Sequence, residues 1–186
     1  MGTVFLGFLG VVGVILAWVA GLYNRFIKLK NNADESYSGI DVQLKRRYDL
    51  IPNLVETVKG YASHEEGTLT KVVEARNFAM DVSKGDLKSQ AEAENALTGT
   101  LKTLFAISEN YPDLKANQNF LDLQGQLSTI EDAIQNARRY YNAVVKDYNI
   151  LCESFPAVFI ANIFGFSKRD YFDISDSERE NVKVKF

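Results

Sequence analysis

The amino-acid sequence predicts an all-α protein in which a single N-terminal transmembrane helix continues into an up-down-up-down four-helix bundle with two long and two shorter helices. The segment from Gly2 to Tyr23 contains no charged side chain. Beyond it, apolar side chains recur at spacings of three and four residues, which is typical of helices that bury one face. These observations divide the chain into an anchor (1–23), a helical-bundle domain (24–174) and a polar C-terminal tail (175–186).

The charge-free segment is long enough to span a bilayer, because a helix needs about 20 residues to cross the hydrocarbon core. Trp18 and Tyr23 lie near its C-terminal end, where aromatic side chains favour the headgroup region. A cleaved signal peptide would require a basic region before the apolar run and small residues at the cleavage site. Only Met1 and Gly2 precede the run, and a cut after Ala20 would place bulky Trp18 near the break. A spanning helix is therefore favoured.

Basic side chains flank the anchor on its C-terminal side only, at Arg25, Lys28 and Lys30. Under the positive-inside rule, this asymmetry predicts an N-terminus outside the cell and a bundle in the cytoplasm. The bias is small, because Asp34 and Glu35 follow at once.

Small residues follow one face of the anchor, at Gly10, Gly13, Ala17 and Gly21. Their spacing of three and four residues would let two helix backbones approach closely, which predicts self-association through this face. In the alternative interpretation, these residues simply face lipid, since glycine and alanine are common in membrane helices.

The first bundle helix is expected to continue directly from the anchor and to end near Lys59, where Gly60 provides a typical C-terminal stop. Pro52 lies inside it and cannot donate a hydrogen bond to the carbonyl of Tyr48, so we expect a local kink. Three further helices are expected at about 64–82, 86–110 and 115–153 from the apolar spacing and its breaks.

A second charge-free segment follows the last helix, and in an up-down-up-down bundle it lies near the bilayer. It is too short to span, so we expect it to contact the membrane or a neighbouring subunit. Closure of the base of the bundle is the alternative. The candidate contact residues are Phe155, Pro156, Phe159, Ile160, Ile163, Phe164 and Phe166.

Polar side chains next to the apolar positions are expected to form structural ion pairs, because a buried charge must be paired to offset its desolvation. The alternative is a ligand pocket. The candidate residues are Arg47, Asp49, Arg76, Glu109, Glu131 and Arg138.

Catalytic, cofactor and metal sites are not predicted. The single histidine, His64, does not supply the Glu-x-x-His pairs of a two-metal helical bundle. The single cysteine, Cys152, has no histidine at helical spacing and excludes an intramolecular disulfide. No glycine-rich phosphate loop suggests a small-molecule substrate, and the intermixed charges, with a net charge of −3, do not indicate nucleic-acid binding.

Several sequence segments are shared with one known family. They are Tyr23-Asn24, residues 40–54 (IDVQLKRRYDLIPNL), residues 109–117 (ENYPDLKAN), residues 138–142 (RRYYN), Asn149 and residues 154–156 (SFP). Through these segments, nearly the whole chain resembles the bacterial LemA family. The resemblance implies a membrane-anchored helical bundle in the bacterial inner membrane and no established common enzymatic activity. Similar magnetosome-associated members bear on membrane shape.

We therefore expect a non-enzymatic scaffold that contacts the lipid bilayer, self-associates as a homo-oligomer and bears on membrane organisation or shape. The alternative is an accessory module that docks on another membrane protein, such as a protease, a transporter or a signalling protein. An unrecognised enzyme is the third hypothesis.

Overall fold

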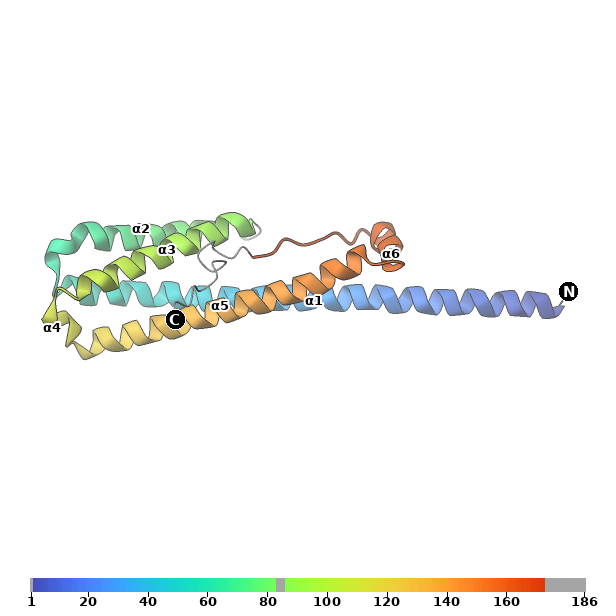
Figure 1. Cartoon of the computed structure of the whole chain (residues 1–186), viewed down its shortest axis with the longest axis horizontal. Coiled ribbons are helices and arrows are strands. Elements are labelled where there is room, and N and C mark those ends of the chain that lie inside the picture. Colours follow the sequence, from blue (N-terminus) through green and yellow to red (C-terminus); the bar gives the residue numbers. More distant parts are fainter. Residues whose placement is uncertain (1, 83–85, 173–186) are drawn as a thin grey trace, which may run out of the picture. The chain divides into compact units, whose positions relative to one another are not determined.

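The computed structural model describes residues 2–82 and 86–172, and these residues form helices and connecting segments without any strand (Figure 1). The all-α prediction is therefore confirmed at the level of helical content, while the tail from 175 lies outside the described residues. The helices are α1 (Gly2–Lys59), the 3₁₀ helix η1 (Ser63–Glu65), α2 (Glu66–Asp81), α3 (Leu87–Ser108), α4 (Pro112–Lys115), α5 (Gln118–Glu153) and α6 (Ala157–Phe164).

Helix α1 runs for 58 residues without interruption, through Pro52, and ends at Lys59 as the sequence predicts. The local kink at Pro52 stays a prediction. Among the described residues, α1 is the one helix long and apolar enough to cross a membrane, and none of its most apolar stretch is buried. The prediction of a long apolar N-terminal helix is confirmed.

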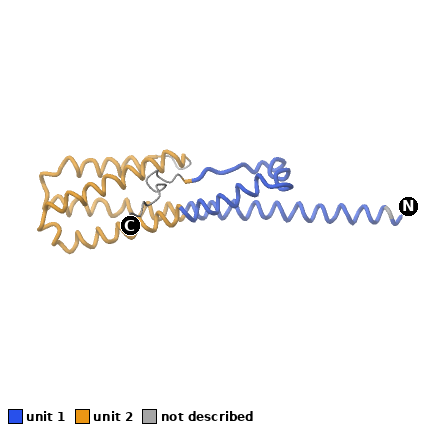
Figure 2. Tube along the Cα trace, in the orientation of Figure 1, with its two compact units in different colours: residues 1–38, 139–171 blue, residues 39–138, 172–186 orange. Residues whose placement is uncertain are grey.

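Two compact units make up the chain, and α1 and α5 contribute residues to both (Figure 2). The first unit contains residues 1–38 and 139–171, and the second contains residues 39–138 and 172–186. The domain boundaries predicted at residues 23 and 174 stay predictions.

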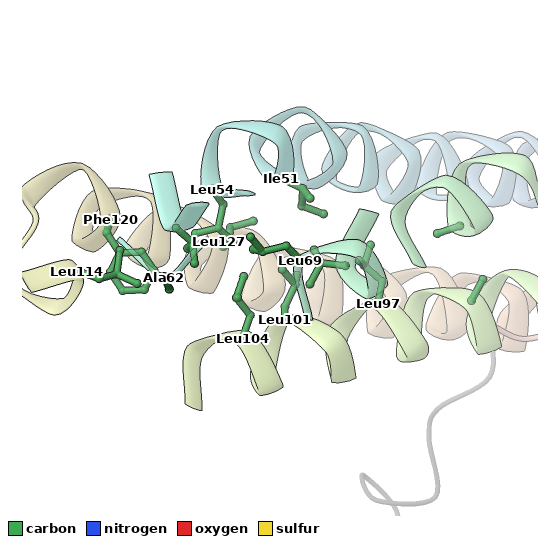
Figure 3. Packing of buried hydrophobic residues seen from close by; sticks show 14 residues of the cluster. Ile51, Leu54, Ala62, Leu69, Leu97, Leu101, Leu104, Leu114, Phe120 and Leu127 are labelled. Atoms are coloured by element: carbon green, nitrogen blue, oxygen red, sulfur yellow. The ribbon is translucent and has the colours of Figure 1, made fainter. Parts of the chain in front are cut away.

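The second unit is organised around apolar side chains from α1, α2, α3, α4 and α5. Figure 3 shows Leu97, Leu101 and Leu104 of α3 pointing into the same core as Ile51 of α1 and Leu69 of α2. The apolar spacing of three and four residues places these side chains on one face of each helix, so burying them stabilises all of the helices together.

A four-residue helix, α4, precedes α5 and was missed by the sequence analysis. Pro112 starts it, because the fixed φ angle of proline suits the first helical position and its missing N–H costs nothing there. Leu114 is fully buried in the core of the second unit. The side chain of Asn117 then accepts a hydrogen bond from the Phe120 main-chain N–H at 3.0 Å, which caps the start of α5.

The first unit has its own apolar core, which joins α6 to α1 and α5. Its buried members are Phe26, Tyr148, Leu151, Cys152, Ala157, Ile160 and Ala161. Gly165 ends α6 with a φ angle of 73°, a left-handed conformation that glycine adopts without steric cost. The sequence indicated an apolar segment here but not its helical conformation.

Candidate functional sites: a buried polar layer and an exposed apolar helix

Arg47 occupies a core position of α1. Counting in sevens from Phe26 reaches Ala33, Ile40, Arg47 and Leu54, and every one of these side chains is buried. Arg47 is only 1 % exposed, although its neighbours in this register are apolar. A charge at such a position must be compensated within the core.

Two carboxylates from other helices compensate Arg47. Its Nη1 donates to Glu131 Oε2 of α5 at 2.7 Å, and its Nη2 donates to Glu94 of α3, whose side chain is fully buried. Nη1 also donates to the Thr98 hydroxyl at 3.0 Å. One guanidinium therefore links α1, α3 and α5.

Tyr48 adds a second donor to Glu94. Its hydroxyl donates to the Glu94 carboxylate. Burial, reinforced by the negative charge of Glu94, raises the pKa of Tyr48 well above its ordinary value. The hydroxyl therefore keeps its proton and remains a donor at any physiological pH.

Arg76 of α2 contacts the main chain of α1. Its Nε donates to the carbonyl oxygen of Tyr48 at 2.8 Å, and its Nη1 donates to the side chain of Asn77 at 3.2 Å. The Tyr48 carbonyl is the one that Pro52, which has no N–H, cannot serve. Together these hydrogen bonds define a polar layer, which consists of Arg47, Tyr48, Arg76, Glu94, Thr98 and Glu131.

The other predicted polar residues lie apart from this layer. Asp49 pairs with Lys45 at 3.4 Å and Glu109 pairs with Lys115, and all four side chains are exposed. The guanidinium carbon of Arg138, which is buried, lies 4.7 Å from the centre of the Phe172 ring. Of the six predicted residues, the structure brings Arg47 and Glu131 into direct contact.

Glu94, Tyr48 and Thr98 were missed by the sequence analysis. A signal for Glu94 was present, since it lies seven residues before Leu101 and therefore shares the core face of α3. Tyr48 and Thr98 carried no comparable signal, because their contacts depend on how the helices pack.

A groove of about 500 Å³ opens between α3 and α5 next to the polar layer. Arg47, Thr98 and Glu131 line one part of it, and Leu101 and Phe105 line another. Glu94 and Glu131 accept hydrogen bonds from within the layer, so they are already engaged without a ligand. Among the described residues, no group of three or more metal-binding side chains occurs.

The small residues of the anchor are open to their surroundings. Gly10, Gly13, Ala17 and Gly21 are all exposed. Apart from its chain neighbours and the nearby backbone of α1, a Cβ atom added to any of the three glycines would meet no described atom within 4 Å. None of the residues that the structure describes covers this face.

Helix α6 and its flanks combine buried and exposed apolar side chains. Ile160 is buried, Pro156 is half-buried, and the Phe166 ring stacks on Phe26 with 4.6 Å between ring centres. In contrast, four large apolar side chains are exposed: Phe155 (82 %), Phe159 (58 %), Ile163 (73 %) and Phe164 (51 %). Such a group on one short segment indicates a surface that something else covers.

The family model that matches this chain and one of its relatives carry the same family name. Residues 36–186 match the LemA family model. The chain is 25 % identical over 185 residues to magnetosome protein MamQ 2 of Paramagnetospirillum magneticum, covering 85 % of this chain and 68 % of that protein. It is 26 % identical to magnetosome protein MamQ of Magnetospirillum gryphiswaldense, covering 81 % and 64 % respectively. It is 28 % identical to protein LemA of Metamycoplasma hominis, covering 94 % and 80 %.

Proposed function

Starting from a chain that belongs to the LemA family, we propose that this protein is a non-enzymatic, membrane-anchored scaffold that self-associates in the bilayer. The observation that carries the proposal is the exposed, charge-free stretch of α1, which continues into the second unit as one unbroken helix. A helix that is apolar on all sides requires an apolar environment, and lipid or another such helix supplies it.

The open small-residue face supports self-association. Glycine and alanine side chains allow close contact between the backbones of two membrane helices. At about 100° per residue, Ala17 and Gly21 lie on the side of α1 opposite Val19 and Leu22, which pack against the core of the first unit. The face is therefore free for a second copy.

The second unit suits the role of a rigid scaffold. We propose that its helical segments form an up-down-up-down four-helix bundle, an arrangement supported by the core that α1, α2, α3 and α5 share. The polar layer ties these helices through directional contacts, and polar groups at core positions can fix the register of helices. The carboxylates of Glu94 and Glu131 already accept hydrogen bonds within the layer, and this supports a non-enzymatic role.

A role in membrane organisation or shape is supported by the relatives. Two of them are named magnetosome proteins, and the match covers most of this chain. The scaffold would act at the bacterial inner membrane, where copies that associate laterally would gather lipids and bundles into one patch.

An orientation with the N-terminus outside and the bundle in the cytoplasm is supported by the basic residues at 25, 28 and 30. A reporter that works only in the cytoplasm, fused after Phe186, should be active. A reporter that works only outside the cytoplasm should be inactive at the same position, and the reverse pattern would overturn this orientation.

Self-association is tested by the mass of the full-length protein in mild detergent. The double variant Gly13→Ile, Gly21→Ile adds bulk to the small-residue face and should reduce a uniform assembly to smaller species. Val11→Phe adds bulk at an exposed position about 120° around the helix from Ala17 and serves as the control, which should keep the assembly. An assembly that survives the double variant would eliminate the anchor face as the contact.

Monomers in the unaltered protein would contradict the scaffold itself. In that outcome, docking on another membrane protein, such as a protease, a transporter or a signalling protein, becomes the better hypothesis.

A further inference from the structure

We propose that α6 is embedded in the leaflet from which α1 leaves the membrane, with its exposed apolar face in contact with lipid. The helix would lie in the membrane interface without spanning the bilayer. The surface consists of Phe155, Phe159, Ile163 and Phe164, and its partner is the lipid that surrounds the end of the anchor.

The composition of α6 excludes a stable exposed helix in water. Its sequence is AVFIANIF, in which Asn162 is the single polar residue. Ala157, Ile160 and Ala161 pack into the core of the first unit, whereas Phe159 and Ile163 point away from it and are exposed. A helix that is almost entirely hydrophobic is normally buried in protein or in a membrane.

The contacts of α6 with α1 determine its depth. The Phe164 ring meets the Tyr23 ring edge to face, with 5.0 Å between ring centres. Val19 and Leu22 pack against the same core. These α1 residues precede Arg25, the first charged residue of the helix, and Val19 lies about 9 Å before it at 1.5 Å per residue. Part of α6 therefore lies beside the charge-free portion of α1.

Charged residues bracket α6 on both sides along the chain. Glu153 ends α5, Lys168 follows α6, and Lys168 Nζ lies 2.7 Å from Glu153 Oε1. Both side chains are exposed, and residues 154–166 between them carry no charge. The exposed ion pair therefore marks where the chain is in water at both ends of this segment. The segment between the two charged residues is entirely uncharged.

Lipid fits this surface better than a second copy of the chain. At about 100° per residue, the side of α1 that contacts α6 is opposite the small-residue face proposed for self-association. Copies joined through that face would leave α6 on the outside of the assembly. What surrounds the outside of a membrane anchor is lipid.

The inference rests on the proposal that α1 spans a membrane, so the experiment contains a separate test of that proposal. Full-length protein with Cys152→Ala receives one cysteine at a time, at Phe159, Ile163, Leu16 or Val42, and a spin label. Reconstituted in vesicles of zwitterionic and anionic phospholipid, each label is exposed to oxygen, which concentrates in lipid, and to a nickel chelate, which stays in water. Leu16 reports the anchor, and Val42 is an exposed apolar residue outside α6.

The labels at Phe159 and Ile163 should show an oxygen-to-nickel collision ratio several-fold above that at Val42 and close to that at Leu16. A high ratio at Leu16 together with low ratios at both α6 positions would overturn the inference while leaving the anchor intact. A low ratio at Leu16 would overturn the anchor itself.

Protection of both α6 positions from both reagents would also overturn lipid contact. Dipolar broadening between labels would then identify a second copy as the partner. Unchanged helical content in circular dichroism checks that each variant is folded.

Discussion

Arg76 donates its Nε–H to the main-chain carbonyl of Tyr48 at 2.8 Å, and so replaces the hydrogen bond that Pro52 cannot make within α1. A proline inside a helix leaves the carbonyl four residues earlier without its usual donor. The guanidinium from α2 satisfies that carbonyl and at the same time joins two helices. A position that weakens α1 locally thus becomes a point of attachment for α2.

Removing this donor should destabilise the protein in a way that depends on Pro52. Arg76→Met leaves the main-chain carbonyl of the half-buried residue Tyr48 without this partner and should lower the free energy of unfolding by about 1–3 kcal/mol. In a Pro52→Ala background, the alanine N–H can serve the carbonyl, so the same substitution should cost clearly less. Denaturant unfolding of the full-length chain in mild detergent measures both costs. Equal costs in the two backgrounds would show that Arg76 acts independently of Pro52.

Breaking the buried pair of Arg47 and Glu94 should be costly. Glu94→Leu leaves the Arg47 guanidinium in the core with only Glu131 as an anionic partner, and it should destabilise the protein by about 3–5 kcal/mol. Adding Arg47→Met removes the isolated charge, so the double variant should be more stable than Glu94→Leu alone.

The exposed pair of Lys45 and Asp49 provides the control for this cycle. Asp49→Asn should change the free energy of unfolding by no more than about 1 kcal/mol, because water already solvates both charges. Additive costs for Arg47→Met and Glu94→Leu would contradict a coupled buried pair.

Tyr48 should make the stability depend on pH in the alkaline range. An unfolded tyrosine releases its proton near pH 10, whereas burial and Glu94 raise the pKa of folded Tyr48 well above that value. Above about pH 10 the folded state therefore binds more protons than the unfolded state, so the free energy of unfolding falls as pH rises. The contribution reaches at most about 1.4 kcal/mol per pH unit and is absent well below pH 10.

Comparison of variants isolates this contribution. Burial also raises the pKa of Tyr148, to about 12, so several tyrosines share the alkaline loss of stability. Tyr48→Phe should flatten the pH dependence above pH 10 relative to the unaltered chain, while the exposed Tyr140→Phe serves as its control. A slope unchanged by Tyr48→Phe would contradict the protonated, buried hydroxyl.

Asn149 should hold the segment after α6 in place. Its side chain donates to the Arg169 carbonyl and accepts from the Arg169 N–H, both at 2.9 Å. Asn149→Asp keeps the acceptor for the Arg169 N–H but places a carboxylate against the Arg169 carbonyl, which repels it. Residues 167–172 should therefore detach. Trypsin should then cleave after Lys168 or Arg169 several-fold faster. Asn119→Asp, on an exposed position of the same helix, should leave the cleavage rate unchanged.

The limits of α1, α2, α3 and α5 followed closely from the spacing of apolar residues and from the residues that end helices. Gly60 after Lys59 is one such signal, since helix ends depend on local backbone preferences. The short helices α4 and α6 were not predicted. Four or eight residues give too few turns for a periodic pattern to emerge, and seven of the eight residues of α6 are apolar.

The polar layer was predictable only in part. Arg47 and Glu131 were identified as polar residues beside apolar positions, but their pairing across 84 residues of sequence depends on the packing of α1 against α5. Asp49 is an acidic residue and was predicted to form a structural ion pair beside the core. It lies instead on the outer side of α1 and pairs with Lys45 in solvent.

The sequence alone determined that the chain is helical and that a charge-free helix begins it, because helical periodicity and the absence of charge are properties of neighbouring residues. The tertiary structure decided which polar side chains meet, that Arg76 serves the carbonyl opposite Pro52, and that α6 packs beside Tyr23 while exposing Phe159. Contacts between distant segments depend on how whole helices pack, and that arrangement is a property of the folded core rather than of any local stretch of the chain.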